Sequence, residues 1–492
     1  MEILNSEERF RIRQLLTNRL AWSIFAIALA SRLFFLIFMS GGLENTGWYW
    51  DAYHHWQISY FTQKIGIYNG PRMWDLGGME YFWGILPSLV QAGLMALFNT
   101  TSIIPFRVAT IVFGSISVSL IYLLCKRYFN QKTAISAALI LAVNPVLIVG
   151  DASGMQEPLA IMLLLLAVWY YDKSEFKSGL LLALASMCRA EYWILSMGML
   201  ALYLVFERNI TRFVPATGGW LLGMIPYMFH LRFQTGNPIY PVYWNLVGNI
   251  AGQWLGPAVW TSHRIFIKNL FMGLFFIVIA SLILTVWKKP RFYALFSLFL
   301  GNLIFLSYVL GFSPYTAGYI DRVLVDRLFA LAYMFLAVLI AIAIGYAIPK
   351  KRPKFSSFHL DKAAISAALI LFFLLWPVIM SYYRPLGELQ AYDDLAVFMV
   401  NNYNGGRILV PGDQPQFVYR LVQRGITAYD LLSLKYHPEN QTATLQWLFQ
   451  SNITMAAIPD YDRFWIAMAG NYTDHFIAIR PGGLAVYRIM GP

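Results

Sequence analysis

The sequence predicts an α-helical polytopic membrane protein with about 11 to 13 transmembrane helices and a small C-terminal α/β domain outside the membrane. Of the 492 residues, 58% are hydrophobic and only 13% are charged, whereas soluble domains carry about 25% charged residues. Apolar stretches long enough to cross about 30 Å of hydrocarbon recur up to residue 382. After that point, short β-type runs replace them.

The expected spans are apolar stretches of roughly 17 to 25 residues. They lie near residues 20–40, 82–98, 104–125, 133–150, 157–171, 213–232, 266–287, 292–312, 328–348 and 362–382. The stretch 178–206 is too short for two full spans and long for one, so we expect a hairpin of short helices whose polar tip is "SMCRAEYW". The charged, amphipathic N-terminus has no small-residue cleavage site, which predicts an uncleaved cytoplasmic helix before the first span.

The net charge of +12 suggests a nucleic-acid partner, but the distribution of the charges along the chain argues against one. After residue 382 there are eight Lys and Arg against nine Asp and Glu, which leaves 29 against 16 for the membrane part. This excess lies in short loops, where it predicts orientation. The loops "CKRYFNQK", "DKSEFK", "ERNITR", "WKKPR" and "PKKRPK" are predicted to be cytoplasmic, and "GDASGMQEP", "GFSPYTAGYIDR" and the loop 41–81 are predicted to be exterior.

One apolar segment conflicts with this orientation. If 82–98 and 104–125 both crossed the membrane, "CKRYFNQK" would lie outside, against its charge. We therefore expect one of them, the first with its Pro87, to be re-entrant or to lie along the surface.

Two domains are predicted from the change in composition. Residues 1–382 form the multi-span catalytic domain with its exterior loop, and residues 383–492 form a soluble exterior α/β domain. The β-type runs of the second domain are "GRILVPGD", "GITAYDLL", "SNITMAAIPDY" and "GLAVYRI". Cys125 and Cys188 lie in or beside apolar segments without a ligand at metal spacing, so we expect no disulfide and no zinc site built on cysteine.

The stretch "GWYWDAYHHW" follows the first apolar run and carries the first candidate residues. Tyr and Trp are typical of an interfacial belt, but such a belt does not need an acid. In a helix, Asp51 stands three and four residues before His54 and His55 and faces the same side. These groups can share a proton, a metal or a substrate hydroxyl, although the histidines fit interfacial hydrogen bonds to lipid headgroups equally well.

The same exterior loop continues with Arg72, Asp75 and Glu80 around a Gly-Gly turn. Arg72 and Asp75 fit an ordinary solvated loop. Glu80 immediately precedes an apolar segment, and an ionised group at membrane depth is by default paired or functional. Glu80 is therefore a candidate substrate-binding residue.

Further candidates lie beside later apolar segments. Glu157 begins a span, where an acid suits the helix dipole, yet Asp151 and Glu157 fall on the same predicted face as Asp51, so three carboxylates can line one exterior cavity. In "CRAEYW", Arg189 and Glu191 form either a neutralising pair or, through Arg189, a phosphate contact.

Two arginines precede a late span. Arg322 and Arg327 lie at the predicted exterior interface, where lipid phosphates sit, and an arginine fork binds a phosphate bidentately. Snorkelling is the alternative explanation.

Together these motifs resemble the GT-C superfamily of polyprenyl-phosphate-sugar glycosyltransferases, in particular its protein O-mannosyltransferase and aminoarabinose-transferase-like branch. The resemblance rests on the order of degenerate motifs along the whole chain. They are Asp51 early in the first exterior loop, "YFWGILPSLV", "RYFNQKTAISAALILAVNP", "SGMQEPLAIMLLLLAVWYY", "SGLLLALASMCRAEYW", "RFQTGNPIYP" and Arg327 before a late span.

The resemblance implies an inverting glycosyltransferase. A sugar would move from a polyprenyl- or dolichyl-phosphate donor to an acceptor hydroxyl on a lipid, glycan or protein at the exterior face of the cytoplasmic membrane, with Asp51 as catalytic base. Arg327 would contact the donor phosphate, with Arg189 or Arg322 as a second contact. No cofactor is certain, and a divalent metal held by Asp51, His54 and His55 is a second possibility. Ala52 stands where protein mannosyltransferases have a second acid, and the Trp-Trp-Asp motif of oligosaccharyltransferases is absent.

Two other interpretations remain open at this stage. A transporter or flippase of lipid-linked sugars would also carry intramembrane charges, but it would tend to show pseudo-symmetric halves, and none is evident. A non-catalytic membrane scaffold would leave Asp51 and Arg327 unexplained. The sequons at Asn440, Asn452 and Asn471 suit an exterior domain.

Overall fold

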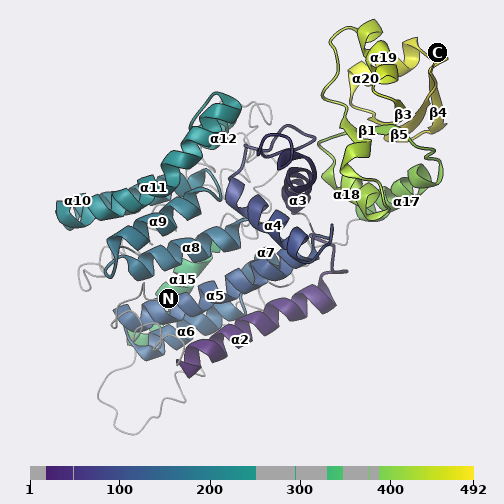
Figure 1. The fold of residues 1–492 in the computed structure, drawn as a ribbon. Helices are drawn as coiled ribbons and strands as arrows, with labels where there is room; N and C mark the ends of the chain where they lie inside the picture. The colour runs from purple at the N-terminus through teal and green to yellow at the C-terminus, as the bar shows by residue number, and fades with distance from the viewer. Residues whose placement is uncertain are drawn as a thin grey trace, which may run out of the picture. The chain divides into compact units, whose positions relative to one another are not determined.

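The computed structural model describes residues 18–47, 49–250, 294, 330–346, 369, 376 and 387–491. These residues are mostly helical and include a five-stranded sheet (Figure 1). The chain divides into two compact units. The first contains Met1–Leu43 and Arg107–Arg384, and the second contains Glu44–Phe106 and Pro385–Pro492. The second unit thus combines the segment after the first apolar run with the C-terminal part of the chain.

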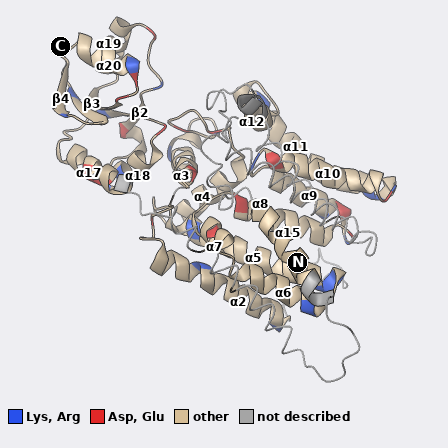
Figure 2. Cartoon of the chain, turned by 180° about the vertical axis from the view of Figure 1, so that it is seen from behind, with Lys and Arg blue, Asp and Glu red and all other residues tan. Residues whose placement is uncertain are grey.

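The first unit is helical, and most of its ribbon carries neither acidic nor basic residues (Figure 2). Its elements are α2 (Arg19–Phe34) with a π-helical extension (Phe35–Met39), α5 (Ile104–Tyr128, from Arg107 on), α6 (Gln131–Ala142), α7 (Pro145–Ala152), α8 (Glu157–Tyr170), α9 (Glu175–Ser186), α10 (Glu191–Val205), α11 (Ile210–Thr235), α12 (Tyr240–Ile250) and α15 (Ala330–Tyr346).

Among the described residues, two helices are long and apolar enough to span a membrane. They are Arg19–Met39 and Ile104–Tyr128, and the bent pair α6 and α7 makes a third if it counts as one span. The predicted spans 266–287, 292–312 and 362–382 lie largely outside the described residues. The total number of spans therefore stays a prediction.

The segment 82–98 forms α4 (Ile85–Leu97), a helix of 13 residues. At 1.5 Å per residue it is about 20 Å long, which is short of the roughly 30 Å of hydrocarbon that a full span must cross. The helix α5 is 25 residues long. Whether α4 crosses the membrane stays a prediction.

Asparagines begin several helices of the first unit. The side chains of Asn18, Asn130, Asn144 and Asn209 accept hydrogen bonds from backbone N–H groups in the first turns of α2, α6, α7 and α11. An N-terminal turn leaves N–H groups without intrahelical partners, so each cap satisfies one of them.

The stretch 133–150, predicted to be one span, is broken at Asn144 and Pro145. The helices α6 and α7 meet at a bend of 57°. Ala142 is the last residue of α6, so its carbonyl has no donor within that helix and needs another one. Ser31 Oγ at 2.7 Å and Arg32 Nη1 at 3.3 Å, both from α2, donate to it. The break is therefore stabilised by the first span.

The stretch 178–206 forms the predicted hairpin of short helices, with Met187–Ala190 as the turn between α9 and α10. The next helix, α11, packs closely against α9 because both carry glycines at the contact. A Cβ on Gly179 would lie 1.8 Å from the carbonyl oxygen of Ala216, and one on Gly219 would lie 2.1 Å from that of Phe176. Small residues of this kind allow helix backbones to approach in membranes.

Three of the basic loops meet at one end of the first unit. Arg127, after α5, contacts Asp172 at 2.9 Å. Arg212, at the start of α11, contacts Glu175 and Glu207 at 2.7 Å each. Because Asp172 follows the C-terminus of α8 and Glu157 begins that helix, the basic loops and Glu157 lie at opposite ends of α8. This arrangement agrees with the sides that loop charge assigns to them.

The second unit contains the α/β part of the chain. Its elements are α3 (Asp51–Phe61) with a π-helical extension (Thr62–Gly66), α4, α17 (Gly387–Asn401), β1 (Arg407–Val410), α18 (Pro415–Gln423), the 3-10 turn η7 (Ala428–Asp430), β2 (Leu431–Ser433), α19 (Gln441–Gln450), β3 (Ile453–Pro459), α20 (Arg463–Asn471), β4 (Phe476–Arg480) and β5 (Leu484–Ile489).

The strand order in the sheet is β2-β1-β3-β5-β4. The strands β2, β1 and β3 are parallel, while β5 is antiparallel to both β3 and β4. The core on the sheet is built around Trp465, Leu448 and Phe476. All four predicted β-type runs contain a strand. The edge strand β4 was missed, because its apolar run "FIAI" is short and is followed at once by Arg480 and Pro481.

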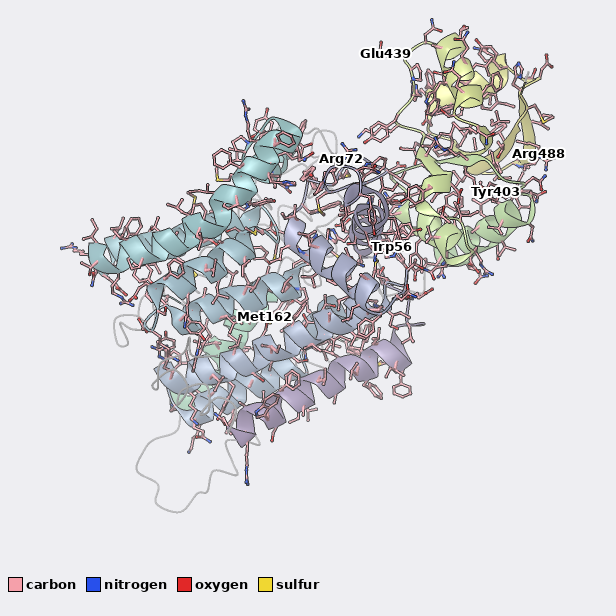
Figure 3. All side chains as sticks on the ribbon, viewed as in Figure 1. Trp56, Arg72, Met162, Tyr403, Glu439 and Arg488 are labelled. Atoms are coloured by element: carbon pink, nitrogen blue, oxygen red, sulfur yellow. The ribbon has the colours of Figure 1, made fainter. Side chains whose placement is uncertain are left out.

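The segment after the first span is fixed to the α/β part by a cluster around Glu44. Tyr419 Oη donates to Glu44 Oε1 at 2.6 Å, and Arg420 Nη1 lies 2.8 Å from Glu44 Oε2. Trp56 of α3, labelled in Figure 3, packs edge-on against Tyr419 of α18 with ring centroids 4.7 Å apart. Thus α3 and α18 form one packed body.

Candidate active site

The stretch "DAYHHW" is helical, as the grouping of Asp51 with His54 and His55 on one side requires. The helix α3 begins at Asp51, which is its only acidic residue in the first turn. Asp51 and His54 are both half-buried, whereas His55 is fully buried. Asp51 therefore lies at a helix N-terminus, where the aligned backbone dipoles stabilise a negative charge.

Both histidines pack against one tryptophan. The ring of His55 meets Trp83 edge-on with centroids 4.7 Å apart, and the ring of His54 lies 5.8 Å from Trp83 at a tilt. The buried Nδ1 atom of His54 has no hydrogen-bond partner among the described residues. The structure thus brings α3 and the segment before α4 together around Trp83, a residue that no sequence pattern singles out.

Asp75, which fits a solvated loop by sequence, is buried, with 3% of its surface exposed. Its Oδ1 accepts a hydrogen bond from Gln57 Nε2 at 2.6 Å, and its Oδ2 accepts from the backbone N–H groups of Gly77 at 3.0 Å and Met79 at 3.1 Å. Burial raises the pKa of Asp75, and these hydrogen bonds, together with nearby His54, oppose that rise. The interpretation of Asp75 as a solvated loop residue is therefore wrong.

Glu80 is half-buried beside the same loop. Its Oε2 is buried and has no hydrogen-bond partner among the described residues. Burial raises its pKa, and the charge of Asp75 adds to the rise, whereas Arg72 and Lys435 lower it. Arg72 itself is exposed in the loop after α3, as predicted (Figure 3).

A metal site formed by Asp51, His54 and His55 finds no support. Within the described ranges, no group of three or more His, Cys, Asp or Glu side chains has the geometry to hold a metal ion. Cys125 and Cys188 are both free and buried.

The first unit holds a second charged cluster. Arg189 Nη1 lies 2.7 Å from Glu157 Oε1, and Arg189 Nε lies 2.5 Å from Glu191 Oε1. All three side chains are less than 10% exposed. The neutralising partner expected for Arg189 is thus present and is joined by Glu157. The phosphate contact of Arg189 stays a prediction.

Asp151 has a partner that the sequence analysis missed. Arg32 Nε of α2 donates to Asp151 Oδ2 at 2.7 Å, and Arg32 is fully buried. A small pocket of the first unit is lined by both Asp151 and Glu157, with Ala330 of α15 on its edge. Whether Asp51 shares a cavity with these two acids stays a prediction.

Other residues were missed although their positions carried a signal. Arg32 and Arg107 both interrupt apolar runs, and a charge at such a position is by default paired or functional. Arg107 is fully buried and donates through Nε to the carbonyl oxygen of Ala152 at 2.7 Å. Gln57 carried no comparable signal. Arg322 and Arg327 lie outside the described residues.

Comparison with known proteins places these observations in context. Residues 84–232, from just before α4 to near the end of α11, match the family model described as dolichyl-phosphate-mannose-protein mannosyltransferase. The match covers less than a third of the chain. A search of curated proteins finds no match.

Solved structures with a similar fold include ArnT from Cupriavidus metallidurans. Bound to undecaprenyl phosphate, it aligns with a TM-score of 0.59 at 12% identity over 97% of this chain and 100% of its own. In the apo state it aligns with a TM-score of 0.58 at 11% identity over 90% and 94%. The apo oligosaccharyltransferase of Archaeoglobus fulgidus aligns with a TM-score of 0.52 at 12% identity over 96% of this chain and 75% of its own. The chain thus has a GT-C-like fold, which confirms the resemblance seen in the sequence.

Proposed function

We propose that this protein is an inverting membrane glycosyltransferase that moves a sugar from a polyprenyl-phosphate-linked donor to an acceptor hydroxyl at the exterior face of the cytoplasmic membrane. The observation that carries the proposal is Asp51 at the first residue of α3, within a GT-C-like fold. The family-model match to dolichyl-phosphate-mannose-protein mannosyltransferases supports a transferase.

The chemistry assigned to Asp51 is general base catalysis. Its carboxylate takes the proton of the acceptor hydroxyl while that oxygen attacks the anomeric carbon of the sugar. The bond from this carbon to the phosphate oxygen breaks, and the lipid phosphate leaves with the electron pair. Attack from the face opposite to the leaving group inverts the anomeric centre. His54, His55 and Glu80 lie on or beside the same helix and are assigned to substrate binding.

The departing phosphate needs cationic stabilisation. Arg327 is assigned this contact, with Arg322 or Arg189 as the second. Arg189 is held by Glu157 and Glu191, so a phosphate would have to compete with two carboxylates for its guanidinium. This competition favours Arg327 and Arg322 over Arg189.

A transporter or flippase is less well supported, because the solved structures with this fold named above are a transferase bound to undecaprenyl phosphate and an oligosaccharyltransferase. The lipid-phosphate donor is proposed by analogy with the first of these.

The test is an assay of the purified full chain in lipid nanodiscs with polyprenyl-phosphate sugars and a hydroxyl acceptor. We expect free polyprenyl phosphate and a glycoside whose anomeric configuration is opposite to that of the donor. Movement of the intact donor across proteoliposomes without any glycoside product would favour the transporter instead.

A further inference from the structure

The loop of residues 73–80 connects the π-helical extension of α3 with the segment that leads into α4. Its first part is fixed by neighbours in sequence, since the N–H of Trp74 donates to Thr62 Oγ1 at 3.0 Å and the N–H of Met73 donates to Tyr81 Oη at 3.0 Å. Its second part is fixed by the α/β part of the second unit. The chemistry proposed above does not use this second set of contacts.

Gln57 joins the helix, the loop and the sheet. Its Nε2 donates to Asp75 Oδ1 at 2.6 Å and to the carbonyl oxygen of Gly412 at 3.0 Å. Gln57 is fully buried on α3, and Gly412 follows β1. One amide thus sets the spacing between α3, the loop 73–80 and the carboxyl end of β1.

Gly412 touches the loop backbone directly. A Cβ on Gly412 would lie 2.5 Å from the carbonyl carbon and oxygen of Leu76 and 2.6 Å from the nitrogen of Gly77. No residue larger than glycine fits unless one of the two backbones moves. The backbone of Gly412 is not in the left-handed region, so this close approach alone accounts for the need for glycine.

The loop after β2 holds the other side. Lys435 Nζ donates to the carbonyl oxygen of Gly77 at 2.9 Å. A Cβ on Gly78 would lie 2.6 Å from Tyr436 Oη, and Gly78 has a φ of +69°, which favours glycine. The loop 73–80 therefore lies between the segments that follow the neighbouring strands β1 and β2 and contacts both.

The segment after β1 is itself fixed on its far side. Tyr461, which follows β3, donates from Oη to Asp413 Oδ2 at 2.8 Å and accepts from Gln414 Nε2 at 3.1 Å. The carboxyl ends of parallel strands are where open α/β sheets usually bind ligands. Here the chain's own loop occupies the ends of β1 and β2.

We propose that the α/β part of this protein acts as a clamp that positions the loop 73–80 for sugar transfer, with Gly412, Gln57, Asp75 and Lys435 as positioning residues. The loop leads directly into Glu80 and Trp83, and Trp83 packs on His54 and His55 beside Asp51. Displacing the loop therefore moves the wall of the site that faces α3. This inference rests on the proposed function for its effect on catalysis, whereas the clamp itself does not depend on it.

The test compares the full-length Gly412→Ala variant with Gly470→Ala. Gly470 lies in α20, its backbone is not left-handed, and a Cβ there meets nothing within 4 Å, so this control adds the same methyl group without a clash. We expect amide hydrogen exchange in residues 73–80 to rise in Gly412→Ala only. The kcat for sugar transfer should fall roughly ten- to a hundredfold, because small misplacements of a site carry penalties of this size, while the donor KM stays near the wild-type value.

A second variant keeps the test decisive if Gly412→Ala does not fold. Lys435 is exposed, so Lys435→Met removes the donor to Gly77 without threatening the core. Its kcat should fall roughly fivefold, as expected for one lost hydrogen bond, with a smaller rise in exchange over the same residues.

Each outcome decides the inference. Exchange in residues 73–80 that matches Gly470→Ala in both variants would overturn the clamp, and raised exchange with wild-type kcat would overturn its role in transfer. If the wild-type protein transferred no sugar from any polyprenyl-phosphate donor, the proposed function would fail, but the exchange data would still decide the clamp.

Discussion

The two units of this protein hold their buried acids in different ways. In the helical unit, Asp151 is paired with Arg32 and Glu157 with Arg189, each at 2.7 Å. In the second unit, the hydrogen bonds to Asp75 come from neutral N–H groups, and Glu80 has no ion pair among the described residues. The buried Asp75 is thus held by amide N–H groups, whereas Asp151 and Glu157 of the helical unit are held by arginines.

This difference separates carboxylates that stabilise the fold from carboxylates that can exchange protons. A carboxylate that is paired with a buried arginine stabilises the fold but is a weak proton acceptor. Burial raises the pKa of Asp75 and of Glu80, and groups with shifted pKa values are candidates for proton exchange. This contrast is consistent with the proposal that proton transfer takes place near α3 of the second unit and that the Arg32–Asp151 pair has a structural role.

The largest expected effect on stability comes from Arg32→Ala. It leaves the carboxylate of Asp151 buried without its cation and removes a donor from the Ala142 carbonyl at the helix break. Breaking a buried pair in this way costs about 3–5 kcal/mol. Loss of helical circular dichroism on heating measures it.

The matched control is Arg127→Ala in the same unit. Arg127 and Asp172 lie 2.9 Å apart but are each 28% exposed, so the loss should stay below about 1 kcal/mol. Equal losses in the two variants would contradict the structural role assigned to the buried pair.

A smaller effect is expected from Gly114→Ala, which disturbs the same pair without removing either partner. A Cβ on Gly114 would lie 2.0 Å from Asp151 Oδ2, so the carboxylate must shift away from Arg32. Overpacking of this kind costs about 1–3 kcal/mol. Gly198→Ala in α10 is the control, because a Cβ there meets nothing within 4 Å. Thermal stability that is the same in both variants would show that the contact is not tight.

The smallest effect is a pH dependence in the second unit. Burial raises the pKa of Glu80 in the folded chain above its ordinary value of 4.5. Between the two pKa values the folded state binds more protons than the unfolded state, so stability falls as pH rises through this window. We expect the Tm of the wild-type protein to fall relative to that of Glu80→Gln as pH rises above 4.5. A constant difference in Tm across this range would contradict the burial of an unpaired Glu80.

The fold was predictable from the sequence where local patterns decide it. The short hairpin 178–206 and the strands around "RILV" and "ITMAAIP" follow from apolar length and turn residues. The break at Asn144 and Pro145 was missed, because its stability depends on donors from Ser31 and Arg32, more than 100 residues away in the chain.

The candidate site was less predictable for the same reason. Asp51 and the histidines stood out because an acid among interfacial aromatics needs an explanation. Asp75 sits in a loop with a Gly-Gly turn, and only its contacts with Gln57 and the packing of Gly412 against the same loop reveal that it is buried. Sequence patterns report which residues are unusual for their position, but they do not report partners that are distant in the chain.

The most direct test of the account is the rate of sugar transfer by Asp51→Asn at saturating donor, compared with Asp474→Asn, which makes the same change at an exposed position of the second unit. We predict that Asp51→Asn loses roughly two orders of magnitude or more in kcat, within the range of a general base, while donor binding and thermal stability stay near those of Asp474→Asn. Transfer by Asp51→Asn at the wild-type rate would contradict the assignment of Asp51 as the catalytic base.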